Sequence, residues 1–307
     1  MKVLVTGANG FIGRALVERL VGDGRYTVLA AIRRNYETLP AQVERTAGDL
    51  DSDWTDRLRG VKFVVHLAGR AHVVDNASPD SLDEYHRVNI AGTAHLARSA
   101  ATAGVRRFVY VSSLKVHGET GCFTERDDPM PVGAYAKSKH EAEIAVRRIA
   151  SDEGLDVVIV RPPLVYGPGV QANFKMLMRA IASGVPLPLR AVRNRRSLVG
   201  VDNLADFIMT CLPHPAAANE TFLVADGEDL STPDLVRRLA RAMERPARMF
   251  SIPPALLRGG AFLCGGRNRA GALLDSLQAD ITKARTHLSW SPPFAVDEGL
   301  RRAALSQ

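Results

Sequence analysis

The sequence has few cysteines: Cys122, Cys211 and Cys264 lie far apart in a chain of 307 residues. An odd number of thiols without paired spacing argues against a disulfide framework and against a cysteine-based zinc site. This usage is typical of reduced thiols in a reducing compartment. We therefore expect a chain with free thiols and no metal in its functional site.

Long apolar runs are also absent. The longest stretches without Asp, Glu, Lys or Arg, such as Phe207–Asn219, have 13 residues, whereas a membrane-spanning helix needs about 18 or more. The first apolar run ends at once in Thr6-Gly7-Ala8-Asn9-Gly10, unlike a signal peptide. We expect a cytoplasmic protein with no membrane partner.

The net charge of +7 includes a local group of arginines at positions 190, 193, 195 and 196. A basic surplus can indicate nucleic-acid binding. No polybasic tail, recognition helix or RNA-binding motif accompanies it, so we expect no nucleic-acid partner. An anionic small substrate explains the surplus better. The composition, 46% hydrophobic and 24% charged, is that of an ordinary globular chain with one or two domains.

The first half of the chain alternates short apolar runs with amphipathic stretches. Strands that are apolar on both faces and alternate with helices indicate a parallel sheet covered on both sides. The sequence therefore predicts an α/β fold with a Rossmann-type, doubly wound parallel sheet. The expected strands are Lys2–Val5, Thr27–Ile32, Phe63–Leu67, Phe108–Val111 and Val157–Val160; the expected helices are Ile12–Val21, Ser81–Ala103 and Ala136–Ser151.

Prolines break up the pattern after Arg161. Ser197–Leu212 has the pattern of a strand and a helix that return to the main sheet, and Thr232–Met243 and Asp280–Leu288 that of helices in a smaller domain. We predict a dinucleotide-binding domain of residues 1–165 and 197–225. A smaller, mainly helical α/β substrate-binding domain is expected at residues 166–196 and 226–307.

Three glycines, Gly7, Gly10 and Gly13, lie between the first strand and the first helix. Glycine suits a backbone that turns sharply and approaches a pyrophosphate closely, while the helix N-terminus offers N–H groups and a positive dipole end. The alternative is that the glycines only form a tight turn. Their position between strand and helix at the N-terminus favours dinucleotide binding.

The end of the second strand bears on the choice between NAD and NADP. A carboxylate normally lies about 20 residues after the glycines and binds the ribose 2′-hydroxyl. Here Ile32 is followed by Arg33 and Arg34, and two guanidiniums could bind a 2′-phosphate. The alternative is that both arginines are solvated or stack on adenine. We favour NADP(H) as the cofactor, with NAD(H) possible.

Tyr135 and Lys139 form a Tyr-x-x-x-Lys pair, and Ser113 ends an earlier strand at the edge where open α/β sheets place their sites. A spacing of four places both side chains on one face of a helix. A tyrosine with a pKa of about 10 is a poor base at neutral pH, but an ammonium and a cationic nicotinamide would favour its phenolate. Alone, the pair could be an exposed helix face. Together with the glycine motif, the three residues are our candidate catalytic set.

These motifs resemble the extended short-chain dehydrogenase/reductase family, also called NAD-dependent epimerase/dehydratases, nearly from end to end. The resemblance implies a cofactor site in which Asp49 meets adenine and His66-Leu67-Ala68-Gly69 lies under the cofactor. It also implies that Arg161-Pro162-Pro163 leads to the substrate domain and that Arg196 binds a diphosphate. The implied cofactor-binding residues are Gly7, Asn9, Gly10, Phe11, Ile12, Gly13, Arg33, Arg34, Asp49, Leu50, Leu67, Ala68, Gly69, Asn89, Tyr135, Lys139 and Pro162.

Departures from the family pattern narrow the reaction. Hexose 4,6-dehydratases of this family carry an Asp-Glu pair after the catalytic Ser or Thr, where this chain has Leu114 and Lys115, so water elimination is not expected. The segments 113–119 and 70–73 are similar to those of a surface-polysaccharide branch. Its members reduce UDP-4-keto-6-deoxy-N-acetylhexosamines at C4 or are labelled UDP-glucose 4-epimerases.

We favour the reductase, because the missing ribose carboxylate suits NADPH, from which cells mainly draw reducing power. A 4-epimerase with retained NAD is the alternative. A regulatory protein that only senses the cofactor is a minor third possibility, since such proteins tend to lose the tyrosine–lysine pair that is intact here.

The substrate site is less well defined by the sequence. His72 and His117 could act as acid or base, or only as hydrogen-bond donors, and Lys115 could be a solvated loop residue. Asn173 could touch the sugar or cap a helix that begins at Phe174. The candidate substrate-binding residues, for a UDP-sugar above all, are Arg70, His72, Ser113, Lys115, Asn173 and Arg196.

The helices expected at residues 81–103 and 136–151 carry apolar positions on more than one face. In the family that this chain resembles, the equivalent helices pair across a two-fold axis as a four-helix bundle. We therefore expect an isologous homodimer. The positions are Ile90, Leu96, Ala97, Ala100, Ala142, Ile144, Ala145 and Ile149.

Overall fold

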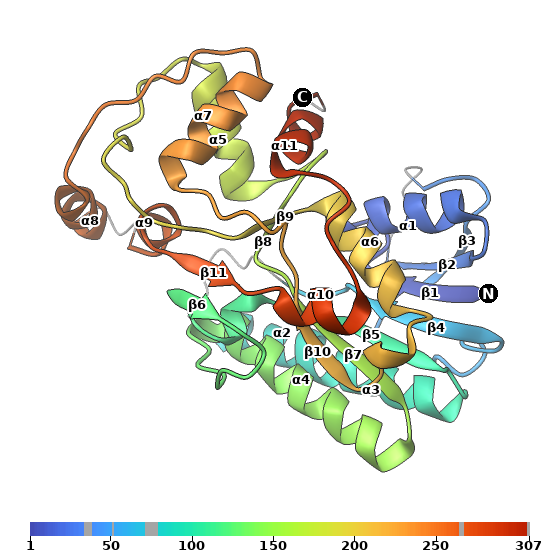
Figure 1. Ribbon diagram of the computed structural model, residues 1–307. Coiled ribbons are helices and arrows are strands. Elements are labelled where there is room, and N and C mark those ends of the chain that lie inside the picture. The colour runs from blue at the N-terminus through green and yellow to red at the C-terminus, as the bar shows by residue number, and fades with distance from the viewer. Residues whose placement is uncertain (34–38, 51, 71–78, 264–266, 306–307) are drawn as a thin grey trace.

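The computed structural model describes the whole chain except residues 34–38, 51, 71–78, 264–266 and 306–307. Among the described residues, seven strands form one parallel sheet in the order β10-β7-β5-β4-β1-β2-β3 (Figure 1). This doubly wound order, with the N-terminal strand in the middle, is that of Rossmann-type folds. The strands are β1 Lys2–Thr6, β2 Thr27–Ile32, β3 Glu44–Ala47, β4 Val61–His66, β5 Arg107–Val111, β7 Asp156–Arg161 and β10 Glu220–Leu223.

Alternate side chains of the strands enter two separate cores, one on each face of the sheet. Val3 and Val5 of β1 pack against α1 and α6, whereas Leu4 between them packs against α3 and α4. Figure 1 shows α1 and α6 above the sheet and α3 and α4 below it. These helices are α1 Phe11–Asp23, α6 Val201–Cys211, α3 Gly92–Thr102 and α4 Gly133–Glu153.

All five predicted strands are confirmed, with ends that differ by at most two residues. Two strands of this seven-stranded sheet were not predicted, β3 and β10, and both lie at its edges. The sequence of β3, Glu-Arg-Thr-Ala, is short and mostly exposed, so it lacks the apolar run that identifies a buried strand. β10 is buried at three of its four residues, so exposure explains the missing signal at β3 but not at β10.

The helix predicted at residues 81–103 is present but not regular. It consists of α2 Pro79–Tyr85, a π-helical segment His86–Ala91, and then α3. The predicted helices at 12–21 and 136–151 are confirmed as α1 and α4. At the end of α1, Gly24 adopts a left-handed conformation with φ of 73°, which is the usual C-terminal cap of a helix.

A second group of elements forms what we call the C-terminal lobe, at the upper left of Figure 1. It comprises α5 Ala172–Ala182, α7 Thr232–Ala242, α8 Pro254–Leu263, α9 Arg267–Leu274 and α11 Val296–Leu305. Phe174, Val236 and Leu300 belong to a core of its own. The exact domain boundaries given above stay a prediction.

Two expectations about the second half were wrong in detail. The strand after Ser197, β9 Leu198–Gly200, does not join the main sheet but pairs with β8 Leu164–Tyr166; only the helix α6 returns to the sheet. The helix predicted near Asp280, α10 Thr282–Leu288, packs through Ala284 and Leu288 into the core between the sheet and α6. Its apolar face fits the main domain and not the lobe. Two further strands, β6 Gly121–Phe123 and β11 Leu277–Ala279, pair with each other.

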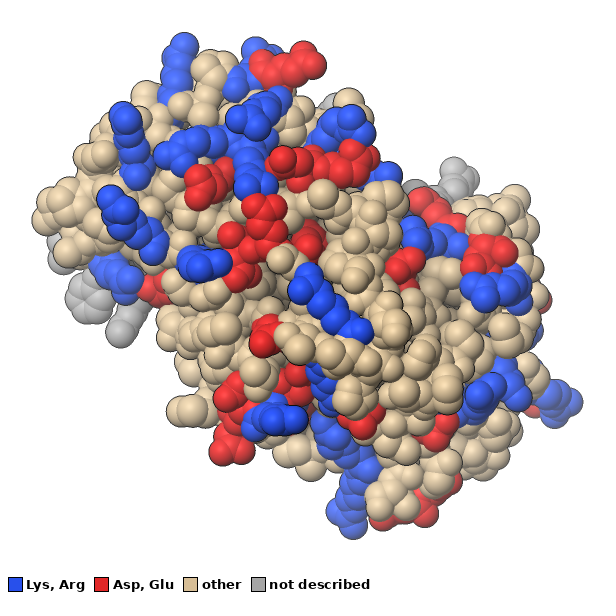
Figure 2. All heavy atoms as spheres, in the orientation of Figure 1, with Lys and Arg blue, Asp and Glu red and all other residues tan. Residues whose placement is uncertain are grey.

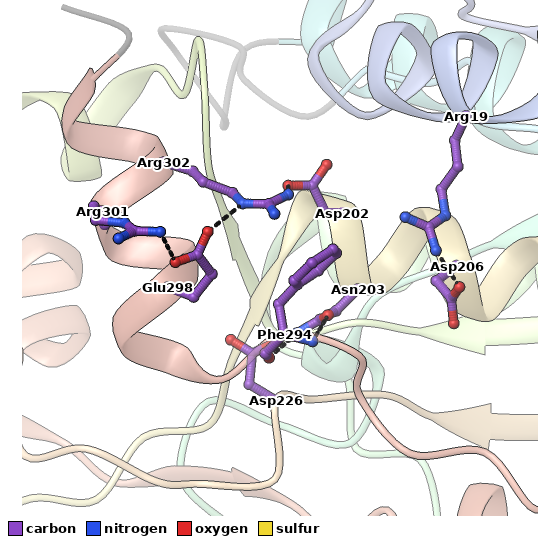
Figure 3. Close-up of polar contacts among 9 residues, drawn as sticks. All are labelled: Arg19, Asp202, Asn203, Asp206, Asp226, Phe294, Glu298, Arg301 and Arg302. Atoms are coloured by element: carbon purple, nitrogen blue, oxygen red, sulfur yellow. Dashed lines mark hydrogen bonds and ion pairs between the residues drawn. The ribbon is translucent and has the colours of Figure 1, made fainter. Parts of the chain in front are cut away.

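Helix α6 joins the sheet to the C-terminal segment (Figure 3). Its Asp206 forms an ion pair with Arg19 of α1, and its Asp202 lies 3.0 Å from the guanidinium of Arg302 on α11. Asn203 exchanges two hydrogen bonds with the backbone of Phe294, at 2.8 and 3.0 Å. These contacts hold α11 against the main domain, next to β8 and β9.

Arg107 at the start of β5 is a buried cation with several partners. Its Nη1 donates to the carbonyl oxygens of Cys211, Leu212 and His214, at 2.9, 3.1 and 2.6 Å, and Nη2 lies 3.2 Å from Asp156. A cation at a helix C-terminus satisfies carbonyl groups that have no partner within the helix. Among the described residues, no helix is both long and apolar enough to cross a membrane.

We predict that Arg107→Met lowers the free energy of unfolding by about 3 kcal/mol or more, because it leaves three buried carbonyls and one carboxylate without their donor. Urea unfolding followed by circular dichroism measures this. The neighbouring Arg106→Met, at an exposed position, is the control and should change stability by less than about 0.5 kcal/mol. Equal effects of the two substitutions would contradict the prediction.

Candidate active site

The turn between β1 and α1 is built from glycines that a side chain would obstruct. Gly7 has a φ of 66°, and a Cβ there would lie 2.9 Å from the backbone N of Ala68. At Gly13 a Cβ would lie 2.1 Å from the carbonyl oxygen of Gly7, so only glycine lets α1 approach the turn this closely. The N-cap of α1 is Gly10, with no side-chain cap and no acidic residue in the first turn. The first N–H groups of α1 therefore face no competing carboxylate, which fits a pyrophosphate.

The strand end beside this turn is β4. Thr6 and Thr93 hold the buried His66 ring from both sides, with Thr6 Oγ1 at 2.7 Å from Nδ1 and Thr93 Oγ1 at 2.9 Å from Nε2. Burial lowers the pKa of His66 to about 3, so the ring is neutral. Thr6 Oγ1 also accepts the N–H of Ala68. The network places residues 67–69 next to the glycine turn, with Leu67 and Ala68 half-buried and Gly69 exposed.

Asn89 lies in the π-helical segment and binds the chain after β4. Its Oδ1 accepts the N–H of Arg70 at 2.8 Å, and its Nδ2 donates to the Arg70 carbonyl at 3.1 Å and to Ser138 Oγ at 2.9 Å. π-helical turns are often found at functional sites. Asn89 is almost fully buried. Its hydrogen bonds connect the π-helical segment with the chain after β4 and with α4.

The candidate adenosine end lies at β2 and β3. Arg33 follows β2 and is exposed, whereas Arg34 lies outside the described residues. Gly48 donates its N–H to the Ile32 carbonyl, which brings the exposed Asp49 beside the end of β2. Leu50 is 9% exposed and packs into the core below the sheet. The structure thus brings Arg33 and Asp49 to the same edge as the glycine turn.

Ser113, Tyr135 and Lys139 come together at the carboxyl edge of the sheet. Ser113 follows β5, and Tyr135 and Lys139 lie on the first turns of α4. Lys139 Nζ donates to the Val111 carbonyl at 2.7 Å and lies 4.3 Å from the centroid of the Tyr110 ring. A Cβ at Gly69 would lie 3.8 Å from Lys139 Nζ. The candidate cofactor segment and the candidate catalytic set are therefore neighbours.

The pKa values of Tyr135 and Lys139 differ from what the sequence led us to expect. Burial raises the pKa of Tyr135 to about 12, against a hydrogen bond with Ser113 that lowers it. Burial lowers the pKa of Lys139 to about 7, against the charge of Glu143, which raises it. We expected the ammonium to favour the phenolate. In the protein alone, desolvation dominates over that effect, and Lys139 donates to a backbone carbonyl.

A buried ion pair lies one helical turn beyond Lys139. Arg161, at the end of β7, binds both carboxylate oxygens of Glu143, with Nε–Oε1 at 3.0 Å and Nη2–Oε2 at 2.5 Å. Its Nη1 lies 2.7 Å from Nε2 of His117. A guanidinium cannot accept a hydrogen bond, so Nε2 of His117 is the acceptor and carries no proton. Burial, together with the Arg161 charge, lowers the pKa of His117 to about 4.

The environment of His117 therefore differs from that of an acid/base residue, the role considered for it from the sequence. It is neutral, buried and stacked on Phe123 at 5.2 Å between ring centroids, so it is neither a ready proton donor nor an exposed ligand. Glu143 and Arg161 were not singled out as polar partners in the sequence. The spacing of four between Lys139 and Glu143 was the available signal, since it places both on one face of α4.

The candidate substrate residues are only partly gathered. Arg70 lies beside Asn89 and its guanidinium is 2.5 Å from Glu84. Pro162, a candidate cofactor residue, is buried and its carbonyl accepts the N–H of Leu114. Lys115 is exposed and pairs loosely with Glu119 at 3.6 Å. Arg196 donates to the Asp275 carbonyl at 2.9 Å. His72 lies outside the described residues.

Asn173 is exposed in the first turn of α5. The N-cap of that helix is Gln171, so the suggestion that Asn173 caps a helix beginning at Phe174 is wrong. Its contact with a sugar stays a prediction. Groups of three or more His, Cys, Asp or Glu side chains able to hold a metal ion do not occur among the described residues.

We predict that Gly13→Ala weakens binding of NADH and NADPH at least about tenfold, or about 1.4 kcal/mol, because the added methyl group must displace the turn at Gly7. Titration by nucleotide fluorescence measures both affinities. The control is Gly22→Ala in the same helix, where a Cβ meets nothing within 4 Å; it should leave affinity unchanged. Normal affinity in Gly13→Ala would show that the turn does not bind the dinucleotide.

The pKa of Lys139 leads to a prediction for the cofactor-free protein. Above about pH 7 the folded chain leaves this amine neutral, while the unfolded chain keeps it protonated up to its ordinary pKa of 10.5. The fold is therefore destabilised most below about pH 7, and the penalty disappears as the pH rises to about 10.5. Lys139→Met removes the penalty. Its stability relative to wild type should fall by about 1.4 kcal/mol per pH unit over this range.

Urea unfolding at about pH 6 and about pH 9 measures this difference. Lys137→Met, exposed on the same helix, is the control and should show no such dependence on pH. A difference between Lys139→Met and wild type that is constant with pH would mean that Lys139 is charged throughout.

Comparison with known proteins agrees with this geometry. Residues 3–225 match the family model described as the NAD dependent epimerase/dehydratase family. A UDP-glucose 4-epimerase of Vibrio cholerae is 40% identical over 98% of this chain and 94% of its own. A 2-alkyl-3-oxoalkanoate reductase of Stenotrophomonas maltophilia is 30% identical over 100% of this chain and 99% of its own.

Solved structures are similar over the whole chain. MoeE5 in complex with UDP-glucuronic acid and NAD superposes with a TM-score of 0.81 and 28% identity, covering 100% of this chain and 98% of that one. The resemblance noted from the motifs and the α/β fold predicted from the sequence are both confirmed. The chain belongs to the NAD-dependent epimerase/dehydratase family.

Proposed function

We propose that this protein is a nicotinamide-dependent enzyme that oxidises or reduces C4 of the sugar in a UDP-sugar. The observation that carries the proposal is the gathering of Ser113, Tyr135 and Lys139 beside the glycine turn and Gly69. A hydroxyl, a phenol and a buried amine at the carboxyl edge of a doubly wound sheet suit proton transfer to or from a secondary alcohol.

Tyr135, Ser113 and Lys139 have separate roles in the proposed reaction. The bound nicotinamide supplies a hydride acceptor or donor next to the sugar. Tyr135 takes or gives the hydroxyl proton, and Ser113, which shares a hydrogen bond with it, orients the sugar oxygen. Lys139 is buried, so any positive charge that it gains is poorly screened and favours the phenolate. In the protein alone the pKa of Tyr135 is high, and a cationic partner beside the phenol would lower it.

The nucleotide-sugar part of the proposal draws on the relatives and on the lobe. The Vibrio relative is named for UDP-glucose and the MoeE5 complex contains UDP-glucuronic acid and NAD. The backbone of Arg196 pairs with Leu230 and with Leu277 of β11, and the residue lies partly buried. A partly buried guanidinium suits a diphosphate, because charge-assisted hydrogen bonds are strong where water is excluded.

Within this function we propose a 4-ketoreductase that uses NADPH. Support comes from the end of β2: Ile32 is buried and the next residue is the exposed Arg33, whose guanidinium could bind a 2′-phosphate. A reductase exchanges its cofactor in every cycle, and a salt-sensitive guanidinium contact suits such exchange. The expected substrate is a UDP-4-keto-6-deoxy-N-acetylhexosamine.

A 4-epimerase with retained NAD is the second candidate, and the similarity to the Vibrio UDP-glucose 4-epimerase over nearly the whole chain favours it. An epimerase returns the hydride that it took, so its cofactor undergoes no net change. The two candidates share the same catalytic residues. They differ in how tightly the cofactor is bound and in whether NADPH is consumed.

The homodimer stays part of the proposal, with weaker support than the sequence suggested. Leu96, Ala97, Ala100, Ala142 and Ile149 are buried within the chain, against the lower face of the sheet. Ile144 on α4 is 54% exposed and Ile90 is half-buried, so these two remain for a partner copy.

The decisive experiment follows NADPH absorbance and product NMR with two substrates. With a UDP-4-keto-6-deoxy-N-acetylhexosamine we expect one NADPH oxidised for each sugar reduced, and with UDP-glucose no UDP-galactose. Interconversion of UDP-glucose and UDP-galactose with no net absorbance change, by protein that retains NAD, would replace the reductase with the epimerase. Failure of both reactions would overturn the proposed function.

Tyr135→Phe tests the catalytic set in either case. It should lower turnover at least about a hundredfold, the scale of a lost acid/base group, with little change in cofactor affinity. Tyr26→Phe is the matched control, because it removes a hydroxyl that lies far along the sheet at the start of β2. Near-normal turnover in Tyr135→Phe would remove this residue from the mechanism.

A further inference from the structure

The positive charge of this chain is concentrated in the C-terminal lobe. Residues 175–196 contain six Lys and Arg and no Asp or Glu, and residues 235–260 contain six Arg and a single acid, Glu244. Since the whole chain has a net charge of only +7, the rest of the molecule is acidic overall. Figure 2 shows Lys and Arg spread over the upper left lobe.

Eight of these twelve cations have no carboxylate partner in an ion pair among the described residues. Arg195, Arg237, Arg238 and Arg258 form ion pairs with acids from elsewhere in the chain. Lys175 and Arg196 are half-buried and bind Gln171 and the Asp275 carbonyl. The remaining six lie at exposed positions without an ion pair to a described acid: Arg179, Arg190, Arg193, Arg241, Arg245 and Arg248. A diphosphate substrate carries too little charge to account for all six, which lie on three separate segments.

Apolar side chains are exposed among these arginines. Segments 184–190 and 248–250 run side by side, with Phe250 N bonded to the Leu187 carbonyl and Arg190 N to the Phe250 carbonyl. On this pair of segments Val185 is 56% and Phe250 is 45% exposed. The Nη1 of Arg248 lies 3.4 Å from the Gly184 carbonyl. Apolar groups and cations therefore share one surface.

The same mixture continues on the adjoining helices. On α5, Met176 is 55% exposed and lies one turn from the exposed Arg179. On α8, Leu257 packs towards the core of the lobe and Leu256 is 67% exposed, next to Gly259 and Gly260. We call the set Met176, Arg179, Val185, Arg245, Arg248, Phe250 and Leu256 the basic-apolar face.

We propose that the basic-apolar face binds the surface of a membrane that contains anionic phospholipids. Cations close to such a surface gain attraction, and large apolar side chains between them enter the boundary of headgroup and acyl chain. A nucleic acid would use the arginines but leave the aliphatic side chains in water. The proposal revises the expectation of no membrane partner, which depended only on the lack of a spanning helix. It is independent of the proposed reaction.

Co-sedimentation of the full-length protein with vesicles tests this. We expect binding to vesicles of phosphatidylglycerol and phosphatidylcholine, and little binding to pure phosphatidylcholine. Arg245→Gln with Arg248→Gln should weaken binding about twenty-fivefold, at about fivefold for each cation. Phe250→Ser with Leu256→Ser should weaken it as well, and this loss should persist at high salt, which screens charges but not apolar burial.

One double substitution and one single substitution serve as controls. Arg59→Gln with Arg106→Gln removes two exposed arginines of the sheet domain, and Leu82→Ser removes an exposed leucine on α2 Pro79–Tyr85; both should bind as wild type does. Circular dichroism checks that every variant is folded.

Three results would overturn the proposal. One is the absence of binding to anionic vesicles at low salt. Another is an equal loss of binding in the control variants. The third is binding to single- or double-stranded DNA that depends on Arg245 and Arg248, without binding to vesicles, which would assign this face to nucleic acid.

Discussion

The carboxylate of Glu143 and the guanidinium of Arg161 face each other in the interior, where both side chains are 5% exposed or less. An unpaired charge at this depth would be very unfavourable, so each residue fixes the position of the other. Glu143 belongs to α4, which carries Tyr135 and Lys139, and Arg161 ends β7 before Pro162. Through its third hydrogen bond, Arg161 also holds His117, which closes the short turn after Ser113. The three candidate catalytic residues thus depend on one ion pair that touches none of them.

The electrostatics of the site follow from the same burial. Lys139 is 5% exposed and has the Val111 carbonyl and the Tyr110 ring as partners, so its charge is not fully compensated. Glu143 is the nearest source of compensation, and its negative charge is already engaged by Arg161. The amine therefore stays near neutrality while its surroundings remain dry, and the protonation of Tyr135 is linked to what occupies the space next to it.

The sequence predicted the centre of the fold better than its edges. Apolar runs identify β1, β2, β4, β5 and β7, because strands buried on both faces leave an unbroken hydrophobic signal. The polar edge strand β3 leaves none, and α10 has the same pattern whether it packs on the sheet or on the lobe. The glycines and the Tyr-x-x-x-Lys spacing located the site, since close approach and helical periodicity are local properties. The pKa values of Tyr135 and Lys139 were not predictable, because desolvation depends on every neighbour and not on the motif.

The π-helical segment His86–Ala91 decides which side chains of the helix that contains it face the chain after β4. A π turn holds one residue more than an α turn, so α3 is rotated by about 100° relative to α2 compared with an uninterrupted helix. The surplus residue is what lets Asn89 turn inwards and bind both backbone groups of Arg70. Deleting one of the residues 86–88 would shift Asn89 by about 100° around the helix axis and move its amide away from Arg70. In this segment a loss of helical regularity thus accompanies the fixing of one buried amide on the backbone of Arg70.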